Sequence, residues 1–227
     1  MSSEEEHPVQ KETWDTFQAR IKALPEGEKD KIETAYQLSK AAHREQKRIS
    51  GERYFEHPRR ASLILIDECK ITNPSIICGV LLHDTLEDTS LFGNPTEMTA
   101  RAFDIHSFHR ISKIFYPETA EIVFYVTEPY VDGKIVKNKA QAKTIKYKRL
   151  EDGPEEALLV KMADRLDNLR TFYPKEGQET PEKKIRETKE ILMPIFKKAY
   201  NKYPAETHYL SEQINNAIKQ LKLIYNI

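Results

Sequence analysis

The sequence is poor in residues that cross-link a chain or interrupt helices. It has only 2 cysteines and 7 glycines among 227 residues. Cys69 and Cys78 both fall in apolar helical patterns, so we expect small buried side chains in a reducing compartment. No cysteine-rich spacing indicates a structural zinc site. Scarce glycine combined with 32% charged residues is typical of a helical protein with short loops.

The chain also lacks a net charge and a long apolar run. Its 36 Lys and Arg residues balance 36 Asp and Glu residues, which gives no overall bias toward nucleic acid or membrane surfaces. No apolar run approaches the roughly 18 residues of a membrane span, and no basic-then-apolar N-terminus indicates a secretory signal. We therefore expect a soluble, cytoplasmic protein with no DNA, RNA or membrane partner.

Apolar periodicity and prolines predict a single helical domain. Residues 1–11 are polar and are expected to form a frayed tail, whereas residues 12–227 are expected to form one domain with its own core. Helix starts are indicated at Pro58, Asn73-Pro74, Asn94-Pro95, Pro117-Glu118, Gly153-Pro154 and Thr180-Pro181. No strand alternation is found, apart from a short turn at residues 131–134. We predict an all-α bundle of roughly nine or ten helices.

The segment 81–89 is the most informative stretch, because an apolar run leads into His83, Asp84, Glu87 and Asp88. If Asn73 caps a helix that continues through residue 88, this acidic cluster falls at the helix C-terminal end, where the helix dipole disfavours negative charge. A bound cation would reverse that penalty. Residues four apart share a helix face, so His83 would lie beside Glu87 and Asp84 beside Asp88. The alternative is a solvated acidic helix end.

Two further segments supply residues of the same chemical types. His57 directly precedes Pro58, so it is expected at the start of a helix, where it either serves as a metal ligand or caps and packs against the helix. Asp164 is one of few polar residues on an expected helix over 158–171 that is apolar on two sides. A buried carboxylate needs a metal or a charged partner, here Lys161 or Arg165.

Together, His57, His83, Asp84 and Asp164 offer two imidazoles and two carboxylates. This mixed nitrogen and oxygen set suits Mn²⁺, Fe²⁺ or Zn²⁺ better than Ca²⁺.

A basic segment precedes His57 in the chain. Residues 43–57 show no helical period and contain Gly51, which indicates a loop. Arg44, Lys47, Arg48 and Arg53 cluster there, although the chain as a whole is neutral. The cluster is either a local phosphate site beside a metal ligand or an ordinary solvated loop.

Taken in order, these segments resemble the HD phosphohydrolase superfamily. More narrowly, they resemble the hydrolase domain of the RelA/SpoT homologues, which remove pyrophosphate from guanosine tetra- and pentaphosphate alarmones. The resemblance spans about residues 35 to 200. The matching motifs are Arg48-x-Ser50-Gly51-x-x-Tyr54-x-x-His57-Pro58, His83-Asp84-x-x-Glu87-Asp88-Thr89, Val160-Lys161-x-Ala163-Asp164-Arg165-Leu166-x-Asn168-x-Arg170-Thr171 and Glu187-Thr188-x-Glu190-Ile191-x-x-Pro194.

The resemblance implies a fold, an activity and a set of site residues. The fold is an all-α HD-domain bundle, and the activity is metal-dependent hydrolysis that yields GDP or GTP and pyrophosphate. The metal, usually Mn²⁺, would be held by His57, His83, Asp84 and Asp164. The attacking water would be positioned and deprotonated by Glu87 and Asp88. The nucleotide and its 3′ side would be surrounded by Arg48, Ser50, Asn168, Arg170 and Thr171.

Two positions depart from the family pattern, and they keep other functions open. Ile49 stands where the family often has lysine, and Asp167 replaces a common histidine. Ile49 therefore leaves room for another substrate, such as NADPH or a different phosphorylated nucleotide. A non-catalytic module that binds an alarmone or a partner protein is a third reading. Because the sequence ends near residue 227, we expect a stand-alone small alarmone hydrolase without a synthetase or regulatory domain.

Overall fold

The computed structural model describes residues 13–94, 100–128, 130–131, 134–135, 139–175, 177 and 179–227. The expected frayed tail at residues 1–11 and the expected helix start at Pro95 lie outside the described residues.

The described elements are helices apart from one short hairpin, which confirms the predicted all-α class. In chain order they are α1 (Trp14–Gln18), η1 (Ala19–Ile21), α2 (Glu26–Ala42), α3 (Glu56–Leu63), η2 (Ile64–Glu68), α4 (Pro74–Leu82), α5 (Thr85–Asp88), α6 (Ala100–Ile114), α7 (Pro117–Val126), β1 (Tyr130–Val131), β2 (Lys134–Ile135), α8 (Lys139–Asp152), α9 (Glu155–Arg170), α10 (Pro181–Glu187), η3 (Thr188–Leu192), α11 (Met193–Phe196), η4 (Lys197–Asn201) and α12 (Pro204–Tyr225). The antiparallel strands β1 and β2 flank the turn predicted at 131–134, of which residues 132 and 133 are not described.

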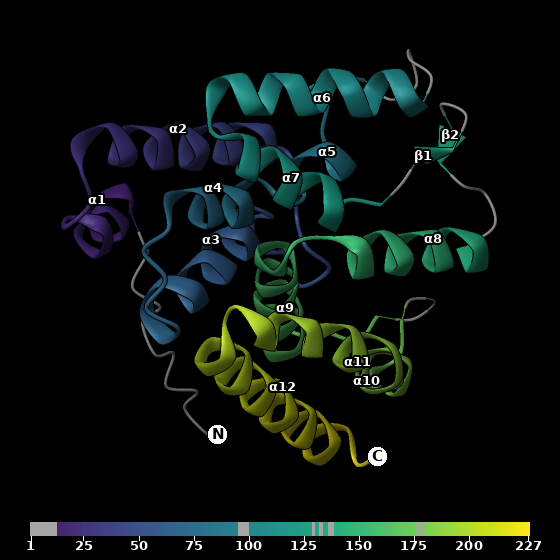
Figure 1. Cartoon of the computed structure of the whole chain (residues 1–227). Coiled ribbons are helices and arrows are strands. Elements are labelled where there is room, and N and C mark those ends of the chain that lie inside the picture. Colours follow the sequence, from purple (N-terminus) through teal and green to yellow (C-terminus); the bar gives the residue numbers. More distant parts are fainter. Residues whose placement is uncertain are drawn as a thin grey trace.

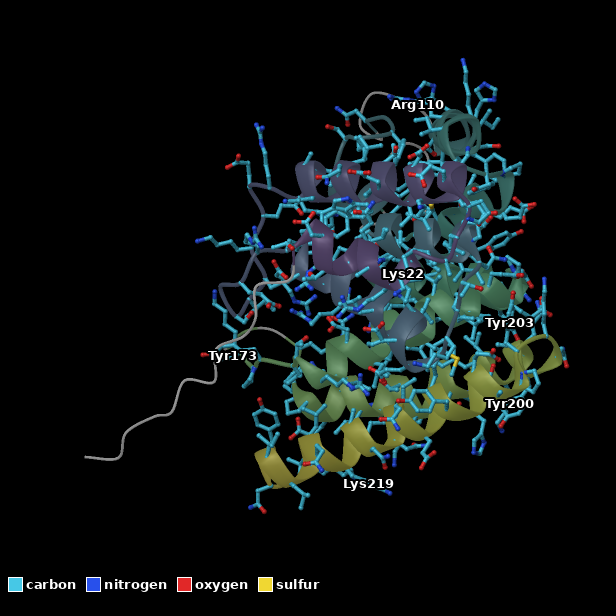
Figure 2. The ribbon with its side chains drawn as sticks, turned by 90° about the vertical axis from the view of Figure 1, so that its left-hand side faces the viewer. Lys22, Arg110, Tyr173, Tyr200, Tyr203 and Lys219 are labelled. Atoms are coloured by element: carbon cyan, nitrogen blue, oxygen red, sulfur yellow. The ribbon has the colours of Figure 1, made fainter. Side chains whose placement is uncertain are left out.

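Helix α9 is the centre of the bundle. It packs against α3, α4, α7 and α12, while α4 also packs against α2 and α7. Figure 1 shows α6 and α12 at opposite edges of the molecule, with α9 between them. Figure 2 shows the same separation in a second view, with Arg110 on α6 at one edge and Lys219 on α12 at the other. Residues at the inner turns of α9 are therefore surrounded by protein.

Two apolar clusters meet at α4, which explains why that helix is apolar on all sides. Ile76 and Val80 belong to the cluster built around α9 and α12. Ile77 and Leu81 belong to the cluster built around α1, α2 and α7. Gly79 brings α4 close to α7, because a Cβ at this position would lie 2.6 Å from Cγ2 of Ile122. Packing on both faces thus fixes the position of α4, and with it the position of His83, which directly follows the helix.

Capping residues place several of the helix starts where the sequence predicts them. Asn73 accepts hydrogen bonds from the backbone N–H groups of Ser75 and Ile76, and Pro74 is the first residue of α4. A cap of this kind typically contributes about 1 kcal/mol. Helices α7 and α10 likewise begin at Pro117 and Pro181.

The position of His57 differs from the prediction. Helix α3 begins at Glu56, so His57 lies inside the first turn and is not in the preceding loop. The backbone N–H of His57 donates to the carbonyl of Tyr54, which extends the helical turn backward past Pro58. The imidazole is therefore held by a helix, with a smaller range of orientations than a loop would allow.

The predicted continuous helix from Asn73 to Asp88 is wrong. Helix α4 ends at Leu82, and the short α5 begins at Thr85. The reason is local competition for carbonyl groups, since the Thr85 hydroxyl donates to the carbonyl of Leu82 (2.6 Å) and the His83 ring bonds to that of Val80 (2.8 Å). His83 and Asp84 consequently occupy the bend between the two helices.

None of the helices in the described part of the chain is both long and apolar enough to cross a membrane.

Candidate metal centre and active site

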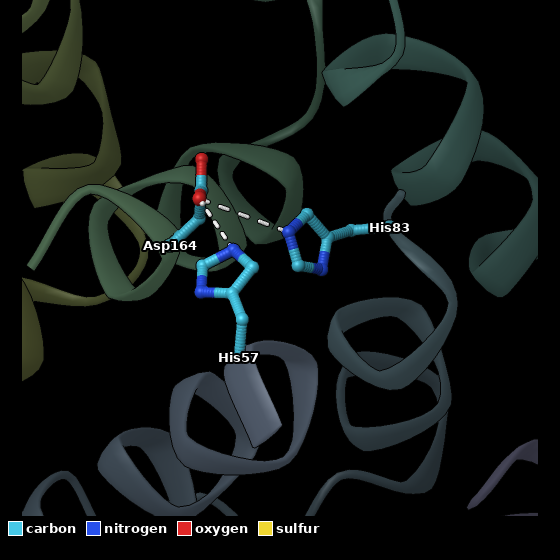
Figure 3. A group of neighbouring side chains, drawn as sticks. All are labelled: His57, His83 and Asp164. Atoms are coloured by element: carbon cyan, nitrogen blue, oxygen red, sulfur yellow. Dashed lines mark ion pairs between the residues drawn. The ribbon is translucent and has the colours of Figure 1, made fainter. Parts of the chain in front are cut away.

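Two histidines and an aspartate from three helical segments meet in the interior. His57 comes from α3, His83 follows α4, and Asp164 lies in the middle of α9 (Figure 3). All three side chains are buried. The two imidazole rings are 5.1 Å apart between centroids. One ligand atom from each of the three residues lies within 4.8 Å of the others, which is the geometry needed to share a metal ion.

Asp84 joins this group and completes the predicted set of four ligands. Its Oδ1 is 3.2 Å from Nε2 of His83, and its Oδ2 is 3.6 Å from Nε2 of His57. Oδ1 of Asp164 lies 3.1 Å and 3.7 Å from the same two nitrogens. The structure therefore brings together all four residues that the sequence analysis assigned to a metal. We call His57, His83, Asp84 and Asp164 the metal group.

The histidine rings are oriented so that Nε2 of each faces the centre of the group. Nδ1 of His83 lies 2.8 Å from the carbonyl oxygen of Val80, and Nδ1 of His57 lies 2.7 Å from Oδ2 of Asp167. Because both partners can only accept, each Nδ1 must carry the hydrogen. Nε2 of His83 is buried without a hydrogen-bond partner among the described residues. An inward-facing nitrogen with no partner fits a divalent cation.

The electrostatics of the group favour positive charge at its centre. Burial disfavours the charged form of His83, but Asp84 and Asp164 outweigh it and raise the pKa of this imidazole to about 10. Burial likewise disfavours ionised Asp164, yet Lys161 and the two histidines hold the pKa of this carboxyl well below its usual range. A metal ion and protons therefore compete for the same nitrogens, and metal binding should release protons.

The geometry of Asp164 is compatible with both of the roles predicted for it. Its Oδ2 lies 2.6 Å from Nζ of Lys161, which is the salt bridge that the sequence allowed. Its Oδ1 faces the two imidazoles. Arg165, the other possible partner, turns instead to Glu187. The Asp164 carboxylate thus accepts a charged hydrogen bond from Lys161 with one oxygen and turns the other toward His57 and His83.

The two predicted acid–base residues lie on α5, next to the metal group. Glu87 lines the same cavity as Asp84, and its Oε2 accepts a hydrogen bond (3.1 Å) from the backbone N–H of Glu128. Burial, with the nearby charge of Glu128, raises the pKa of Glu87 to about 7 against the opposing pull of Lys146. A carboxyl with a pKa near neutrality can both accept and release a proton at physiological pH.

Asp88 is connected to the metal group through a tyrosine. The Tyr54 hydroxyl lies 2.6 Å from Oδ2 of Asp88 and 3.0 Å from Oδ2 of Asp84. The Tyr54 ring stacks on His43 with centroids 4.7 Å apart. Tyr54 was not predicted as a site residue, although its place in the motif before His57 is a signal for one.

The part of the chain that carries these residues matches a known family. A family model described as "HD domain" matches residues 35–198. The chain belongs to the HD domain family.

Relatives of this HD domain are larger proteins. A protein of Aquifex aeolicus named guanosine-3′,5′-bis(diphosphate) 3′-pyrophosphohydrolase is 35% identical over 170 residues, which cover 73% of this chain and 21% of the relative. A Brucella melitensis protein named GTP pyrophosphokinase rsh is 32% identical over 168 residues, or 72% of this chain and 20% of the relative. The chain thus spans about a fifth of the length of the curated relatives it matches.

A solved structure has the same fold over most of this HD domain. It belongs to a metazoan orthologue of SpoT, described as hydrolysing ppGpp and as having a role in starvation responses. The match has a TM-score of 0.58 and 25% identity, and it covers 84% of this chain and 94% of that chain. The expected HD-domain bundle is therefore confirmed.

The HD domain also contains a residue beside the predicted ligands to which the sequence analysis gave no role. Asp167 is buried and bonds His57 through Oδ2, while its Oδ1 accepts a hydrogen bond of 2.7 Å from Nε of Arg60. Arg60 in turn pairs with both carboxylate oxygens of Glu52. The histidine orientation therefore depends on a chain of charged side chains that reaches the loop before α3. The departure from the family pattern at this position was the only sequence signal.

Replacing Asp167 tests this orienting role. We expect Asp167→Asn to lower the affinity for Mn²⁺ or Zn²⁺ by about 10- to 100-fold, because the charge-assisted bond to His57 is lost. Competition with a chromophoric chelator measures this affinity. The exposed Asp30→Asn is the matched control, since Asp30 lies on the outer face of α2. Equal affinity in both variants would show that His57 keeps its orientation without Asp167.

Four of the five residues predicted to surround the substrate line one cavity of about 290 Å³. They are Arg48, Ser50, Asn168 and Thr171. Nη2 of Arg48 donates to Oδ1 of Asn168 (2.8 Å), and the amide of Asn168 donates to Asp164. This cavity is therefore linked to the metal group by direct hydrogen bonds.

Arg170, the fifth predicted residue, is not brought to this cavity. Its guanidinium pairs with the carboxylate of Glu68 (2.6 Å) and bonds to Gln213 of α12.

The basic segment before His57 was expected to be either a phosphate site or a solvated loop, and its residues divide between the two. Lys47 and Arg48 line the cavity, whereas Arg44 is exposed beside Glu45. Tyr173 also lines this cavity, and Figure 2 shows it on the opposite side of the molecule from Tyr200 and Tyr203.

Proposed function

We propose that this HD domain is a metal-dependent hydrolase that removes the 3′-diphosphate of guanosine tetra- and pentaphosphate, giving GDP or GTP and pyrophosphate. The supporting observation is the placement of Glu87 on one cavity with His57, Asp84 and Asp164. The name of the Aquifex aeolicus relative and the activity described for the metazoan SpoT orthologue support the choice of substrate.

The cofactor of the proposed reaction is a single Mn²⁺, with Fe²⁺ or Zn²⁺ as alternatives. His57, His83, Asp84 and Asp164 would hold it, and this donor set suits metals of borderline hardness. When bound, such a cation offsets negative charge on the attacked phosphoryl group and makes a water easier to deprotonate.

The remaining steps fall to side chains of the chain itself. Glu87 accepts the proton of the attacking water, for which a pKa of about 7 is well suited. Asp88, fixed by Tyr54, holds that water or the leaving 3′ oxygen. Arg48 offsets the negative charges of the substrate, and Asn168 contacts the ribose.

A product assay tests the proposal. Metal-stripped protein is reloaded with Mn²⁺ and incubated separately with guanosine tetraphosphate, its adenosine counterpart and NADPH, and the products are separated by chromatography. We expect pyrophosphate and GDP from the guanosine substrate, and no product when EDTA is present.

The same assay distinguishes the proposed hydrolase from an enzyme that acts on NADPH and from a non-catalytic binding module. Phosphate release from NADPH, without reaction of the guanosine substrate, would contradict the proposed substrate. Tight binding of guanosine tetraphosphate without turnover in any metal would contradict an enzymatic role. His83→Ala serves as a matched inactive control, because it removes one proposed ligand and leaves the cavity beside Arg48 unchanged.

A further inference from the structure

His43 is a buried histidine that lies outside both cavities of the candidate site. Only 1% of the residue is exposed, and it lines neither the cavity that contains Ser50 nor the cavity that contains Glu87. It ends α2, where its backbone N–H donates to the carbonyl of Ser39 at 3.1 Å. His43 is therefore not placed to touch a substrate, and any effect that it has on the chemistry must pass through its neighbours.

The imidazole of His43 holds two neighbouring side chains at once. One face of the ring stacks on Tyr54, with centroids 4.7 Å apart and planes inclined by 19°. At the ring edge, Nδ1 lies 2.6 Å from Oε1 of Gln46, whose Nε2 donates to the carbonyl of Asp88 at 2.6 Å. Because a carbonyl can only accept, the amide nitrogen of Gln46 must face Asp88, and Nδ1 of His43 must carry the hydrogen. Burial lowers the pKa of His43, against the hydrogen bond with Gln46 and the charges of nearby carboxylates, so the ring is neutral at physiological pH.

Both of these neighbours bond to Asp88. The Tyr54 hydroxyl lies 2.6 Å from the carboxylate oxygen Oδ2, and Gln46 donates to the backbone carbonyl of the same residue. Asp88 is exposed and is the last residue of α5, a helix of only four residues. A single helical turn is not stable by itself, and an exposed carboxylate is not held by packing. The hydrogen bonds from Tyr54 and Gln46 therefore determine where Asp88 lies and where its carboxylate points.

The orientation of the Tyr54 ring decides which carboxylate its hydroxyl serves. The hydroxyl has a single hydrogen, yet it lies 2.6 Å from Oδ2 of Asp88 and 3.0 Å from Oδ2 of Asp84. The ring meets His57 edge-on, with centroids 6.3 Å apart, and its stacking contact is with His43. Loss of the His43 ring would let the phenol turn about its Cα–Cβ bond and carry the hydroxyl away from Asp88.

We propose that His43 is a positioning residue for Asp88, because its ring fixes Tyr54, whose hydroxyl keeps the Asp88 carboxylate in place for the reaction. This inference rests on the proposed function for the role of Asp88. Stacking on Tyr54 is the main contact, since Tyr54 bonds the carboxylate, whereas Gln46 bonds only the backbone of the same residue.

Steady-state kinetics with guanosine tetraphosphate and Mn²⁺ test the proposal. We expect His43→Ala to lower kcat by about 10- to 100-fold, the size of effect that a displacement of about 1 Å can have. KM and the affinity for Mn²⁺ should stay those of the wild type, because His43 lines neither cavity. The matched control is His106→Ala, since His106 is exposed on α6, and its kcat should equal that of the wild type. An unchanged kcat in His43→Ala, or an equal loss of Mn²⁺ affinity, would overturn the positioning role.

Two conservative variants separate the contacts of the ring. His43→Phe keeps the stack on Tyr54 and loses the bond to Gln46, and it leaves no donor or acceptor unpaired at Nε2, which has no partner among the described residues. It should fold like the wild type and keep kcat within about threefold. His43→Asn offers Gln46 a donor but no ring, and its kcat should fall as in His43→Ala. The opposite ranking of these two variants would contradict a role through stacking.

A double-variant cycle distinguishes action through Tyr54 from a general structural role. We expect Tyr54→Phe, which keeps the ring and removes the hydroxyl, to lower kcat about as much as His43→Ala does. Adding His43→Ala to Tyr54→Phe should then lower kcat by less than about threefold further, because the contact through which His43 acts is already gone. A full second loss in the double variant would show that His43 acts independently of the hydroxyl, and the proposal would fail.

Amide hydrogen exchange tests the placement of Asp88 without turnover. The backbone N–H of Asp88 donates to the carbonyl of Asp84 at 3.0 Å, and its exchange should become about 10-fold faster in His43→Ala but not in His43→Phe. Faster exchange throughout α2 and α4, with no larger effect in α5, would indicate a role in the core alone and would overturn the proposal. If the wild type does not hydrolyse guanosine tetraphosphate, the proposed function fails, and the exchange rates still decide whether His43 holds Asp88.

Discussion

We expect Glu87→Gln to lower the turnover of guanosine tetraphosphate, the proposed substrate, by about 10²- to 10⁴-fold, the range usual for loss of a general base. Glutamine keeps the size of the side chain and can still accept the hydrogen bond from the backbone N–H of Glu128, but it cannot accept a proton. Because Glu87 is not among the four proposed ligands, metal content should remain that of the wild type. Single-turnover rates and metal analysis of the same sample measure both effects.

The pH dependence gives a second test of the same role. Burial raises the pKa of Glu87 to about 7, so this carboxyl is protonated and unable to act as a base below that pH. The wild-type rate should therefore rise with pH through about 7 and level off above it, and this limb should be absent in Glu87→Gln. The exposed Glu151→Gln is the control and should follow the wild-type profile. Near-normal turnover in Glu87→Gln would remove Glu87 from the proposed role.

Asp164→Ala is expected to abolish metal binding and to lower turnover by more than about 10³-fold, since several kcal/mol of transition-state stabilisation depends on the cation. The substitution also leaves the buried Lys161 without its partner at 2.6 Å. Breaking a buried ion pair in this way typically destabilises a protein by about 3–5 kcal/mol. Metal bound per protein molecule and the free energy of unfolding in urea measure the two effects.

A double variant separates the metal role of Asp164 from its salt bridge. Adding Lys161→Met to Asp164→Ala removes the unpaired charge, so stability should recover in large part while metal binding stays absent. If the single variant loses stability yet binds metal with unchanged stoichiometry, the carboxylate serves only Lys161. Recovery of metal binding in the double variant would contradict the proposed ligand set in the same way.

The sequence determined the helical class and much of the helix placement, because these depend on local chemistry. Asn73-Pro74 and Thr180-Pro181 start helices through a cap and a fixed proline φ, whatever the rest of the chain does. His57, His83, Asp84 and Asp164 were identified as one group because their residue types suit a single cation. The structure brings their side chains close together, and their role as metal ligands stays a prediction.

Only the tertiary structure decided how these residues are held and which others join them. The bend after Leu82 arises because the side chains of His83 and Thr85 bond to backbone carbonyls of α4. The periodicity of apolar residues does not predict these bonds. Asp167 orients His57 across 110 positions of sequence, and Arg170 turns away toward Glu68 of another segment. Such contacts depend on which helix faces pack together, and packing is a property of the whole chain. Local patterns can specify what a side chain is able to do, whereas its partner is fixed only once distant helices meet.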